Sequence, residues 1–324
     1  MSISKELFIE MSKVLIDARK SNPGWLYNSG VSTNKPFEAR RLGDDSFKGK
    51  GPTTRLFNNY TPYDDRNAPD LFAEVFMNKV DNDAKSYFLC TELAIRTKDK
   101  TYCPFRDGTI NKNKSCRIEE HEERAFYNYY MNRESVDTDE IRIIYYSMPL
   151  REDKPNEKKL KDVDAIGLSS DGHTAYLLEL KNVESKETLV RSSLEIYTYY
   201  SRLGLNKADG KRKMLERLKN DFGSIFCNVT DIRPGILLIN GSEQYKVFAR
   251  MMSNEDISYS NIKRLIIGLG LDVFSVNKYA ENTLIPFKSD NDVIEYSEVA
   301  SDETKVRPVV KLASGEYIRI EKAY

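Results

Sequence analysis

Residues 162–181 read DVDAIGLSSDGHTAYLLELK, two apolar segments on either side of Asp171-Gly172. Both segments carry the β-branched, aromatic and aliphatic residues of half-buried strands. Asp-Gly between such segments is a strong hairpin signal, because both positions of the tight turn need positive φ. The stretch therefore predicts a β-hairpin with a two-residue turn at 171 and 172. That turn fixes the register, which pairs Leu168 with Ala175, Ile166 with Leu177, Asp164 with Glu179 and Asp162 with Lys181.

This register places two carboxylates, Asp164 and Glu179, opposite each other on a partly apolar face. Directly opposed side chains lie roughly 4.5–5.5 Å apart at Cβ, where like charges repel. Compensation would come from a raised pKa on one acid, a nearby lysine or a bound cation, and oxygen ligands at this spacing suit a hard ion such as Mg²⁺. The alternative is an ordinary ion pair between Asp162 and Lys181 on a wet face, with Asp164 and Glu179 splayed into water.

The spacing of Glu179 and Lys181 carries little information by itself, because an acid two residues before a lysine recurs elsewhere in the chain. The other instances are Glu152/Lys154, Glu157/Lys159, Glu184/Lys186 and Glu303/Lys305. Only Glu179 sits in an apolar strand. Asp164, fourteen intervening residues and then Glu179-Leu180-Lys181 at the end of that strand resemble the PD-(D/E)xK, or restriction-endonuclease-like, nuclease superfamily. One departure is that no proline precedes Asp164, and Pro69-Asp70 is too distant to serve.

The resemblance implies an α/β fold whose core runs α-β-β-β-α-β, with helices flanking a central mixed sheet, and it spans roughly residues 115–275. The flanking segments supply candidates in that order. They are a helix at 118–133, a strand at 141–146, the hairpin, a helix at 187–203, and apolar strands at 235–239 and 264–269. In the second helix, Glu195 and Tyr199 are similar to the glutamine-x-x-x-tyrosine element of some members, with glutamate in place of glutamine.

The first helix offers an inward-facing acid. Ile118, Ala125, Phe126 and Tyr129 recur at helical spacing, and Glu122 falls on the same face. We expect the other acids of this helix, Glu119, Glu120 and Glu123, to be solvated charges that favour the helix start.

The resemblance also implies a site and a reaction. Asp164, Glu179, the carbonyl of Leu180 and Glu122 would hold Mg²⁺, for which Mn²⁺ could substitute, and Lys181 would position or help deprotonate the attacking water. The implied function is hydrolysis of phosphodiester bonds in nucleic acid, most simply as a DNA endonuclease of restriction, defence or repair type. The alternative is a nuclease-like fold that no longer cuts and serves as a nucleic-acid or protein binding module. Homodimer formation stays open.

A local basic run follows the expected site. Lys+Arg and Asp+Glu both number 50, so the chain has no global field that would attract a polyanion. Between 202 and 219, however, cations outnumber acids, and Arg202, Lys207, Lys211, Arg212 and Lys213 are candidates for phosphate contacts. The alternative is an exposed amphipathic helix around Met214, Leu215 and Leu218.

Length and composition suit one large domain or two modest ones, with enough apolar residues for a core. We expect an N-terminal helical and loop-rich extension at 1–100, a nuclease-like core at 101–285, and a C-terminal hairpin extension at 286–324. The extension should hold helices at 2–19 and 69–80 and a loop at 21–67 that interleaves aromatic residues and cations. The final hairpin should turn at Ser314-Gly315. No run of eighteen apolar residues and no signal peptide occur, so a cytoplasmic location without membrane contact is expected.

Other chemistries find less support in the sequence. Cys90, Cys103 and Cys116 are evenly spaced near His121, but no CxxC pair accompanies them, which favours buried free thiols over a zinc or iron–sulfur site. The chain has two histidines, His121 and His173, and no G-x-S-x-G nucleophile motif. Gly268-Leu269-Gly270 lacks the remaining glycine of a dinucleotide site.

Overall fold

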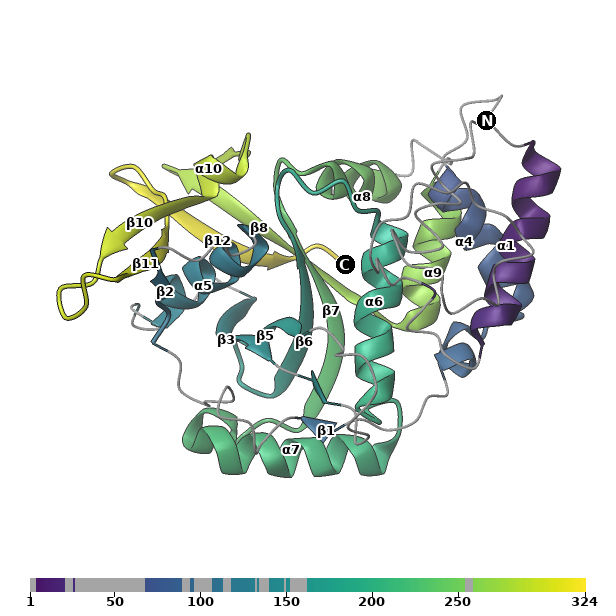
Figure 1. The fold of residues 1–324 in the computed structure, drawn as a ribbon, viewed down its shortest axis with the longest axis horizontal. Helices are drawn as coiled ribbons and strands as arrows, with labels where there is room; N and C mark the ends of the chain where they lie inside the picture. The colour runs from purple at the N-terminus through teal and green to yellow at the C-terminus, as the bar shows by residue number, and fades with distance from the viewer. Residues whose placement is uncertain are drawn as a thin grey trace. The chain divides into compact units, whose positions relative to one another are not determined.

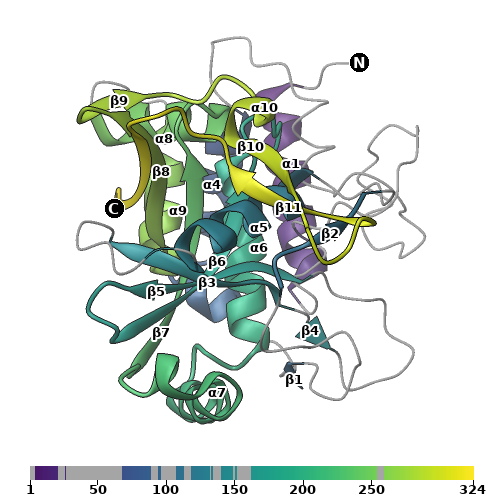
Figure 2. The same cartoon turned by 90° about the vertical axis from the view of Figure 1, so that its left-hand side faces the viewer.

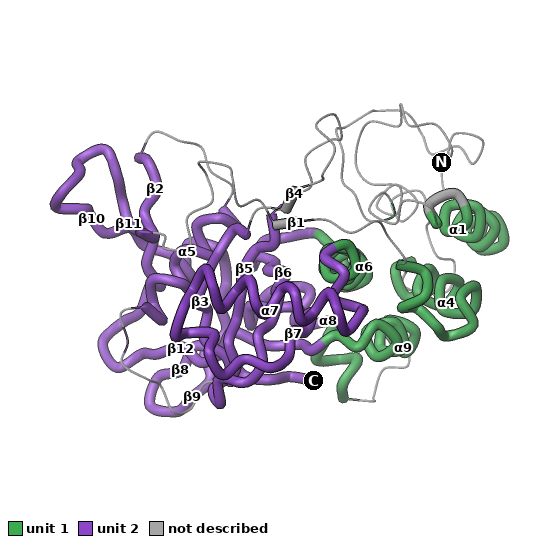
Figure 3. The backbone as a smooth tube through the Cα atoms, turned by 90° about the horizontal axis from the view of Figure 1, so that it is seen from below, with its two compact units in different colours: residues 1–91, 187–202, 247–271 green, residues 92–186, 203–246, 272–324 purple. Residues whose placement is uncertain are grey.

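The structure is a computed structural model that describes residues 4–20, 26, 68–88, 94–95, 107–112, 118–131, 133, 140–148, 150–151, 162–253 and 259–324. The architecture is α/β, with a curled mixed β-sheet flanked by helices (Figure 1). Two compact units divide the chain (Figure 3). Unit 1 comprises Met1–Thr91, Glu187–Arg202 and Val247–Leu271, and unit 2 comprises Glu92–Lys186, Leu203–Lys246 and Asp272–Tyr324. Unit 1 thus combines the N-terminal segment with two stretches from the expected core.

The regular secondary structure of unit 1 is all helical among its described residues. Its elements are α1 (Lys5–Arg19), α4 (Ala68–Lys79), the 3-10 helix η2 (Ala84–Phe88), α6 (Leu189–Arg202) and α9 (Ser260–Leu269). Helix α8 (Glu243–Ser253) crosses from one unit to the other. The helices predicted at 2–19, 69–80 and 187–203 are therefore confirmed. No helix among the described residues combines the length and apolar character that a membrane crossing requires.

The strand predicted at 264–269 is wrong, because these residues form the end of helix α9. From Ile262 onward the buried residues are Ile262, Leu265, Ile266 and Leu269, which is helical spacing. The six residues 264–269 alone are too few to reveal this helical period. A residue of another helix caps the start of α9. Asp70 of α4 accepts hydrogen bonds from the backbone N–H groups of Asn261 at 2.9 Å and Ile262 at 3.0 Å.

The main sheet of unit 2 carries the predicted hairpin. Its strand order is β12-β8-β7-β6-β5-β3, with β9 (Thr283–Ile285) paired to β8. The strands are β3 (Ile141–Met148), β5 (Val163–Ser169), β6 (Thr174–Lys181), β7 (Asp231–Ile239), β8 (Asp272–Ala280) and β12 (Glu316–Lys322). Strands β6, β7 and β8 run parallel, and the other pairs are antiparallel. The strands predicted at 141–146 and 235–239 are confirmed. The strand that pairs with β7 in parallel is β8, in place of the one predicted at 264–269.

The remaining strands of unit 2 lie in two small sheets. One pairs β1 (Ala94–Ile95) with β4 (Leu150–Arg151), and the other has the order β10-β11-β2 (Figure 2). The second sheet contains β10 (Ile294–Glu298), β11 (Lys305–Val310) and β2 (Ile110–Asn111). Helix α5 (Ile118–Met131) packs on both β3 and β11, and helix α7 (Ala208–Phe222), followed by η3 (Gly223–Phe226), packs on β7.

The predicted C-terminal hairpin is wrong, although its turn is present. The N–H of Glu316 donates to the carbonyl of Ala313, and Gly315 has φ +83°. The strands on either side belong to different sheets, however, because β11 pairs with β10 and β2 whereas β12 pairs with β8. The turn thus leads the chain from one sheet into the other.

The register of the β5–β6 hairpin is as predicted, but its turn is not. Leu168 pairs with Ala175 and Ile166 pairs with Leu177. The strands end at Ser169 and begin again at Thr174, so the connection has four residues instead of two. Of the two central residues only Gly172 has positive φ, at +73°, and Asp171 instead accepts hydrogen bonds from Ser169 and from the His173 N–H. A four-residue loop built around a type I turn preserves the same pairing.

Candidate functional site

The far end of the hairpin opens at the two predicted acids. Regular pairing between β5 and β6 stops at Ala165 and Leu178, one position before Asp164 and Glu179. Strand β6 continues in parallel pairing with β7 as far as Lys181. On the β5 side the Oδ2 atom of Asp164 accepts the N–H of Leu180 at 2.8 Å, so a carboxylate takes the place of a strand carbonyl. The strands therefore part where the acidic side chains are.

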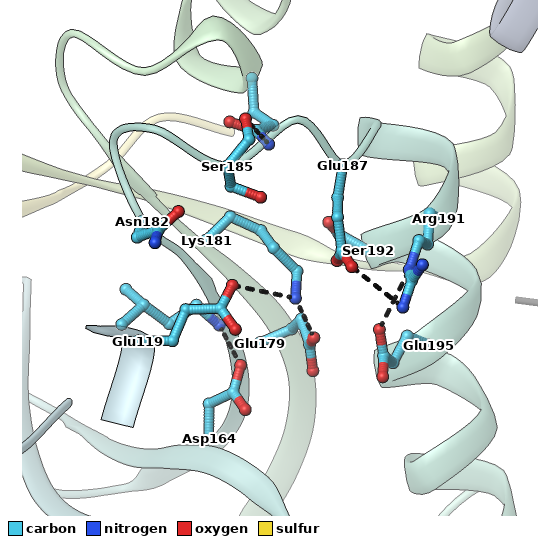
Figure 4. Close-up of polar contacts among 12 residues, drawn as sticks. Glu119, Asp164, Glu179, Lys181, Asn182, Ser185, Glu187, Arg191, Ser192 and Glu195 are labelled. Carbon is cyan, nitrogen blue, oxygen red and sulfur yellow. Dashed lines mark hydrogen bonds and ion pairs between the residues drawn. The ribbon is translucent and has the colours of Figure 1, made fainter. Parts of the chain in front are cut away.

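Lys181 compensates the buried charge of Glu179. Its Nζ atom lies 2.7 Å from Oε1 of Glu179 and 3.6 Å from Oε1 of Glu119, between the two carboxylates (Figure 4). Glu179 is 2% exposed and Lys181 is 3% exposed. Two residues apart on one strand, their side chains share a face. The wet-face alternative is therefore wrong for both residues, and Asp162 is exposed just before β5 begins.

Helix α5 contributes more acids than predicted. Glu122 is fully buried, as expected, but Glu123 is also buried, at 3% exposure, and accepts a hydrogen bond from the Ser147 hydroxyl at 2.7 Å. Glu119, expected in solvent, is the acid that reaches Lys181. The prediction was wrong for both Glu119 and Glu123. Glu119 lies three residues before Glu122, so helical periodicity already placed these two on one face.

The carboxyl of Glu122 faces another acid, Asp290. Burial, followed by the charges of Asp290 and Glu119, raises the pKa of Glu122 well above its usual range. Burial also raises the pKa of Asp290. No N–H or hydroxyl donor among the described residues reaches either carboxyl oxygen of Glu122, whose neighbour is the carboxyl group of Asp290. Two neighbouring buried carboxyl groups need either a compensating cation or a proton on one of them.

Sequence reasoning missed Asp290, which begins the short helix α10 (Asp290–Val293) in the expected C-terminal extension. Its Oδ1 atom accepts the N–H of Glu184 at 3.1 Å, and its Oδ2 atom lies 3.3 Å from Nδ2 of Asn182. These residues belong to the turn that follows Lys181. The one available signal was Ser289-Asp290, a helix-start pattern with no reference to the site.

The glutamine-like element lies on α6 in unit 1. The hydroxyl of Tyr199 donates to Oε1 of Glu195 at 3.0 Å. Arg191, at 5% exposure, lies within ion-pair distance of both Glu187, at 3.0 Å, and Glu195, at 3.7 Å (Figure 4). Glu195 is therefore part of a buried ion cluster along its own helix.

The basic run is largely paired with acids. On α7, Arg212 contacts Asp209 at 2.6 Å and Glu216 at 2.8 Å, and Lys213 contacts Asp209 at 2.7 Å. Lys211 lies 2.6 Å from Asp231 at the start of β7, outside the run that suggested a surplus of cations.

The remaining residues of the run fit the amphipathic-helix alternative. Met214 and Leu218 are buried, and Lys207 is exposed just before α7 begins. Arg202 ends α6 in unit 1.

The donors predicted for Mg²⁺ are oxygen atoms, which suits a hard cation. Asp164 and Glu179 come from the open end of the hairpin, and no N–H or hydroxyl donor among the described residues reaches the buried carboxyl of Glu122. Within the same part of the chain, no three aspartate, glutamate, histidine or cysteine side chains are grouped as a metal site. The predicted donors therefore suit Mg²⁺ in chemical kind, but they are not grouped as a metal site among the described residues.

The alternative cysteine site lies mostly beyond the described residues, which do not include Cys90, Cys103 and Cys116. His121 is described, and its Nδ1 atom lies 2.6 Å from the Tyr296 hydroxyl. His173 is exposed beside the hairpin turn, as expected. The loop predicted at 21–67 also lies outside the described residues, apart from Leu26.

Comparisons with known proteins add no relative. No family model, no curated protein and no solved structure matches the chain.

Proposed function

We propose that the protein is a Mg²⁺-dependent nuclease that hydrolyses phosphodiester bonds in nucleic acid, as a DNA endonuclease of restriction, defence or repair type. The observation that carries the proposal is the buried ion pair of Lys181 and Glu179, on the strand next to Asp164 at the open end of a hairpin. The element order α5, β3, β5, β6, α6, β7, with β7 parallel to β6, supports a restriction-endonuclease-like core.

The chain's own residues would divide the work of cleavage. A water attacks phosphorus while negative charge grows on the non-bridging and leaving oxygens. Lys181 would orient that water or take part in its deprotonation, and its ammonium would stabilise the developing charge. Glu179 and Glu119 hold the ammonium in place at 2.7 and 3.6 Å. The N–H of Leu180 fixes the carboxylate of Asp164.

A bound Mg²⁺ would be held by Asp164, Glu179 and the carbonyl of Leu180, with Glu122 completing the shell directly or through water, and it would supply concentrated positive charge at the phosphate. Contact with the DNA backbone by Arg202, Lys207, Lys211, Arg212 and Lys213 is part of the proposal. The paired cations would exchange their acid partners for phosphates on binding.

The test is nicking of supercoiled plasmid in Mg²⁺, Mn²⁺ or EDTA. We expect cleavage with either metal, none in EDTA, and loss of cleavage in Lys181→Ala and Asp164→Ala, with both variants still folded by circular dichroism. The matched control is Lys186→Ala, which removes the same charge from an exposed position five residues further on. Full activity in both site variants would sink the assignment.

A second candidate is a nuclease-like fold that binds nucleic acid without cutting it. The absence of a three-acid metal group from the described part of the chain favours this alternative. Retardation of labelled DNA on a gel by protein that fails to nick in either metal would support it over the enzyme.

A further inference from the structure

A buried carboxylate outside the expected nuclease core holds the turn that follows Lys181. Asp290 is 8% exposed, accepts the N–H of Glu184 on one oxygen and lies beside the amide of Asn182 on the other. The turn is also closed by a bond from the Ser185 N–H to the Asn182 carbonyl, at 3.2 Å. Hydrogen bonds to a charged acceptor are stronger than neutral ones. One side chain thus restrains the backbone directly after β6.

The same carboxyl group connects this turn to helix α5. Asp290 lies within hydrogen-bonding reach of Glu122, which is fully buried. Glu119, one turn earlier on α5, contacts the ammonium of Lys181. Asp290 therefore touches both elements that bring the acids and the lysine together: the end of β6 and the buried face of α5.

Asp290 itself is held from both sides along the chain. Before it, the N–H of Phe287 donates to the carbonyl of Asn240 at 2.9 Å, and the Phe287 ring is buried. After it, the carbonyl of Val293 accepts the N–H of Lys311 at 2.9 Å. Asp290 can act as an anchor because these two backbone hydrogen bonds restrain its own segment independently of its contacts with the site.

We infer that Asp290 is a positioning residue of the active site, holding the 182–185 turn and α5 so that Lys181, Glu119 and Glu122 keep their places. The inference rests on the proposed nuclease function. Residues that orient the groups of a metal site typically contribute about 10–100-fold to metal affinity or activity. A misplacement of about 1 Å is enough to cause a loss of that size.

The test compares three variants in single-turnover nicking at saturating Mg²⁺. We expect Asp290→Ala to lower the rate at saturating DNA by about 10–100-fold, with the DNA concentration for half-maximal rate unchanged. Asp290→Asn should stay within about threefold of wild type, because its Oδ1 still accepts the Glu184 N–H and its amide can donate to Glu122. Asn291→Ala, the exposed neighbour on the same helix, is the control and should match wild type.

Amide hydrogen exchange over residues 181–186 separates this inference from the nuclease proposal. We expect faster exchange at Glu184 in Asp290→Ala than in wild type, because its N–H loses an acceptor. Unchanged exchange at Glu184 in Asp290→Ala would overturn the contact. A wild-type nicking rate in the same variant would overturn the positioning role. If Asp290→Ala does not fold, Asn182→Ala replaces it, with an expected loss of about 3–10-fold, and wild-type activity there overturns the role. Wild-type protein that never cuts overturns the nuclease proposal and this role with it, whatever the exchange data show.

Discussion

Two buried cations in this protein are each held between two carboxylates, and they are built in different ways. Arg191 has Glu187 at 3.0 Å, just before α6 begins, and Glu195 at 3.7 Å on α6, each four residues away along the chain. Lys181 has Glu179 at 2.7 Å on its own strand and Glu119 at 3.6 Å on a helix some sixty residues earlier. The first cluster is complete within one helix turn on either side. The second exists only when strand and helix come together.

The difference fits a stabilising role for the Arg191 cluster and, under the proposed function, a role in catalysis for the Lys181 cluster. Charged pairs at i and i+4 satisfy each other wherever the helix forms. The Lys181 cluster gathers acids from separate elements at a place where regular strand pairing stops. Clusters of that kind shift local electrostatics in the way that catalysis needs. Substitutions that break one cluster or the other test this difference.

The largest effect should come from breaking the helical cluster. Arg191→Met leaves Glu195 buried without its cation, and removal of one partner of a buried pair costs about 3–5 kcal/mol. We expect a loss of that size in the free energy of unfolding, measured by urea denaturation, and the same loss in Mg²⁺ and in EDTA. Glu187→Gln is the milder control, since the Glu187 side chain is partly exposed. A loss that shrinks in Mg²⁺ would make the two clusters alike.

Breaking the assembled cluster should give a loss that depends on metal. Lys181→Met removes the ammonium that compensates Glu179 and Glu119, so the variant should be less stable than wild type in EDTA. A cation that binds the freed carboxylates would restore about 1.4 kcal/mol when present at tenfold its dissociation constant. The measurement is urea denaturation of this variant across a MgCl₂ titration. Equal stability at every Mg²⁺ concentration would contradict a metal site at the hairpin.

The acids of α5 should make stability depend on pH. Burial raises the pKa of Glu123 well above its ordinary value of 4.5, so the folded protein binds more protons than the unfolded chain above that value. The free energy of unfolding should therefore fall as pH rises from about 5 towards neutrality, by at most about 1.4 kcal/mol per pH unit for each such group.

Glu123→Gln tests the source of that dependence, because an amide keeps the contact with Ser147 but does not titrate. We expect a flatter profile in urea denaturation at successive pH values. An unchanged slope would assign the dependence to other groups, Glu122 first among them.

The smallest effect concerns the turn that sets the hairpin register. Gly172 has φ +73° and no atom near an added Cβ, so Gly172→Ala introduces only backbone strain, worth about 1–2 kcal/mol. Gly223, with φ +61° and equally open space, is the matched control. Both alanine variants should lose similar stability by thermal denaturation. Only Gly172→Ala should also lower nicking activity, if the register there positions Asp164 and Glu179.

Sequence reasoning recovered the hairpin because its information is local. The register followed from the position of the Asp-Gly turn, and a four-residue loop around Asp171 gave the same pairing as the expected two-residue turn. Periodicity likewise identified Glu122 as inward. It did not identify Glu123, because a buried glutamate needs a partner such as Ser147 that only the folded chain supplies.

The wrong predictions likewise arose where the outcome depends on residues outside the segment that was read. The segment 264–269 looked like a strand until Ile262 was included in its period. The segments on either side of Ser314-Gly315 looked paired with each other, but their partners are distant strands. Asp290 had no sequence signal that connected it to the site, because its role depends on a contact with residues 182–184.

The cap that Asp70 provides for α9 has a consequence for synthesis on the ribosome. Asp70 and Ile262 are 192 residues apart, so the start of α9 cannot receive its cap until most of the chain has emerged. At about 5–20 residues per second, Asp70 waits roughly 10–40 s for its partner. During that interval the apolar side chains of α4, Leu71, Phe72 and Phe76 among them, have no α9 to cover them. The face of α4 that packs against α9 is therefore open to chaperones and proteases during that interval.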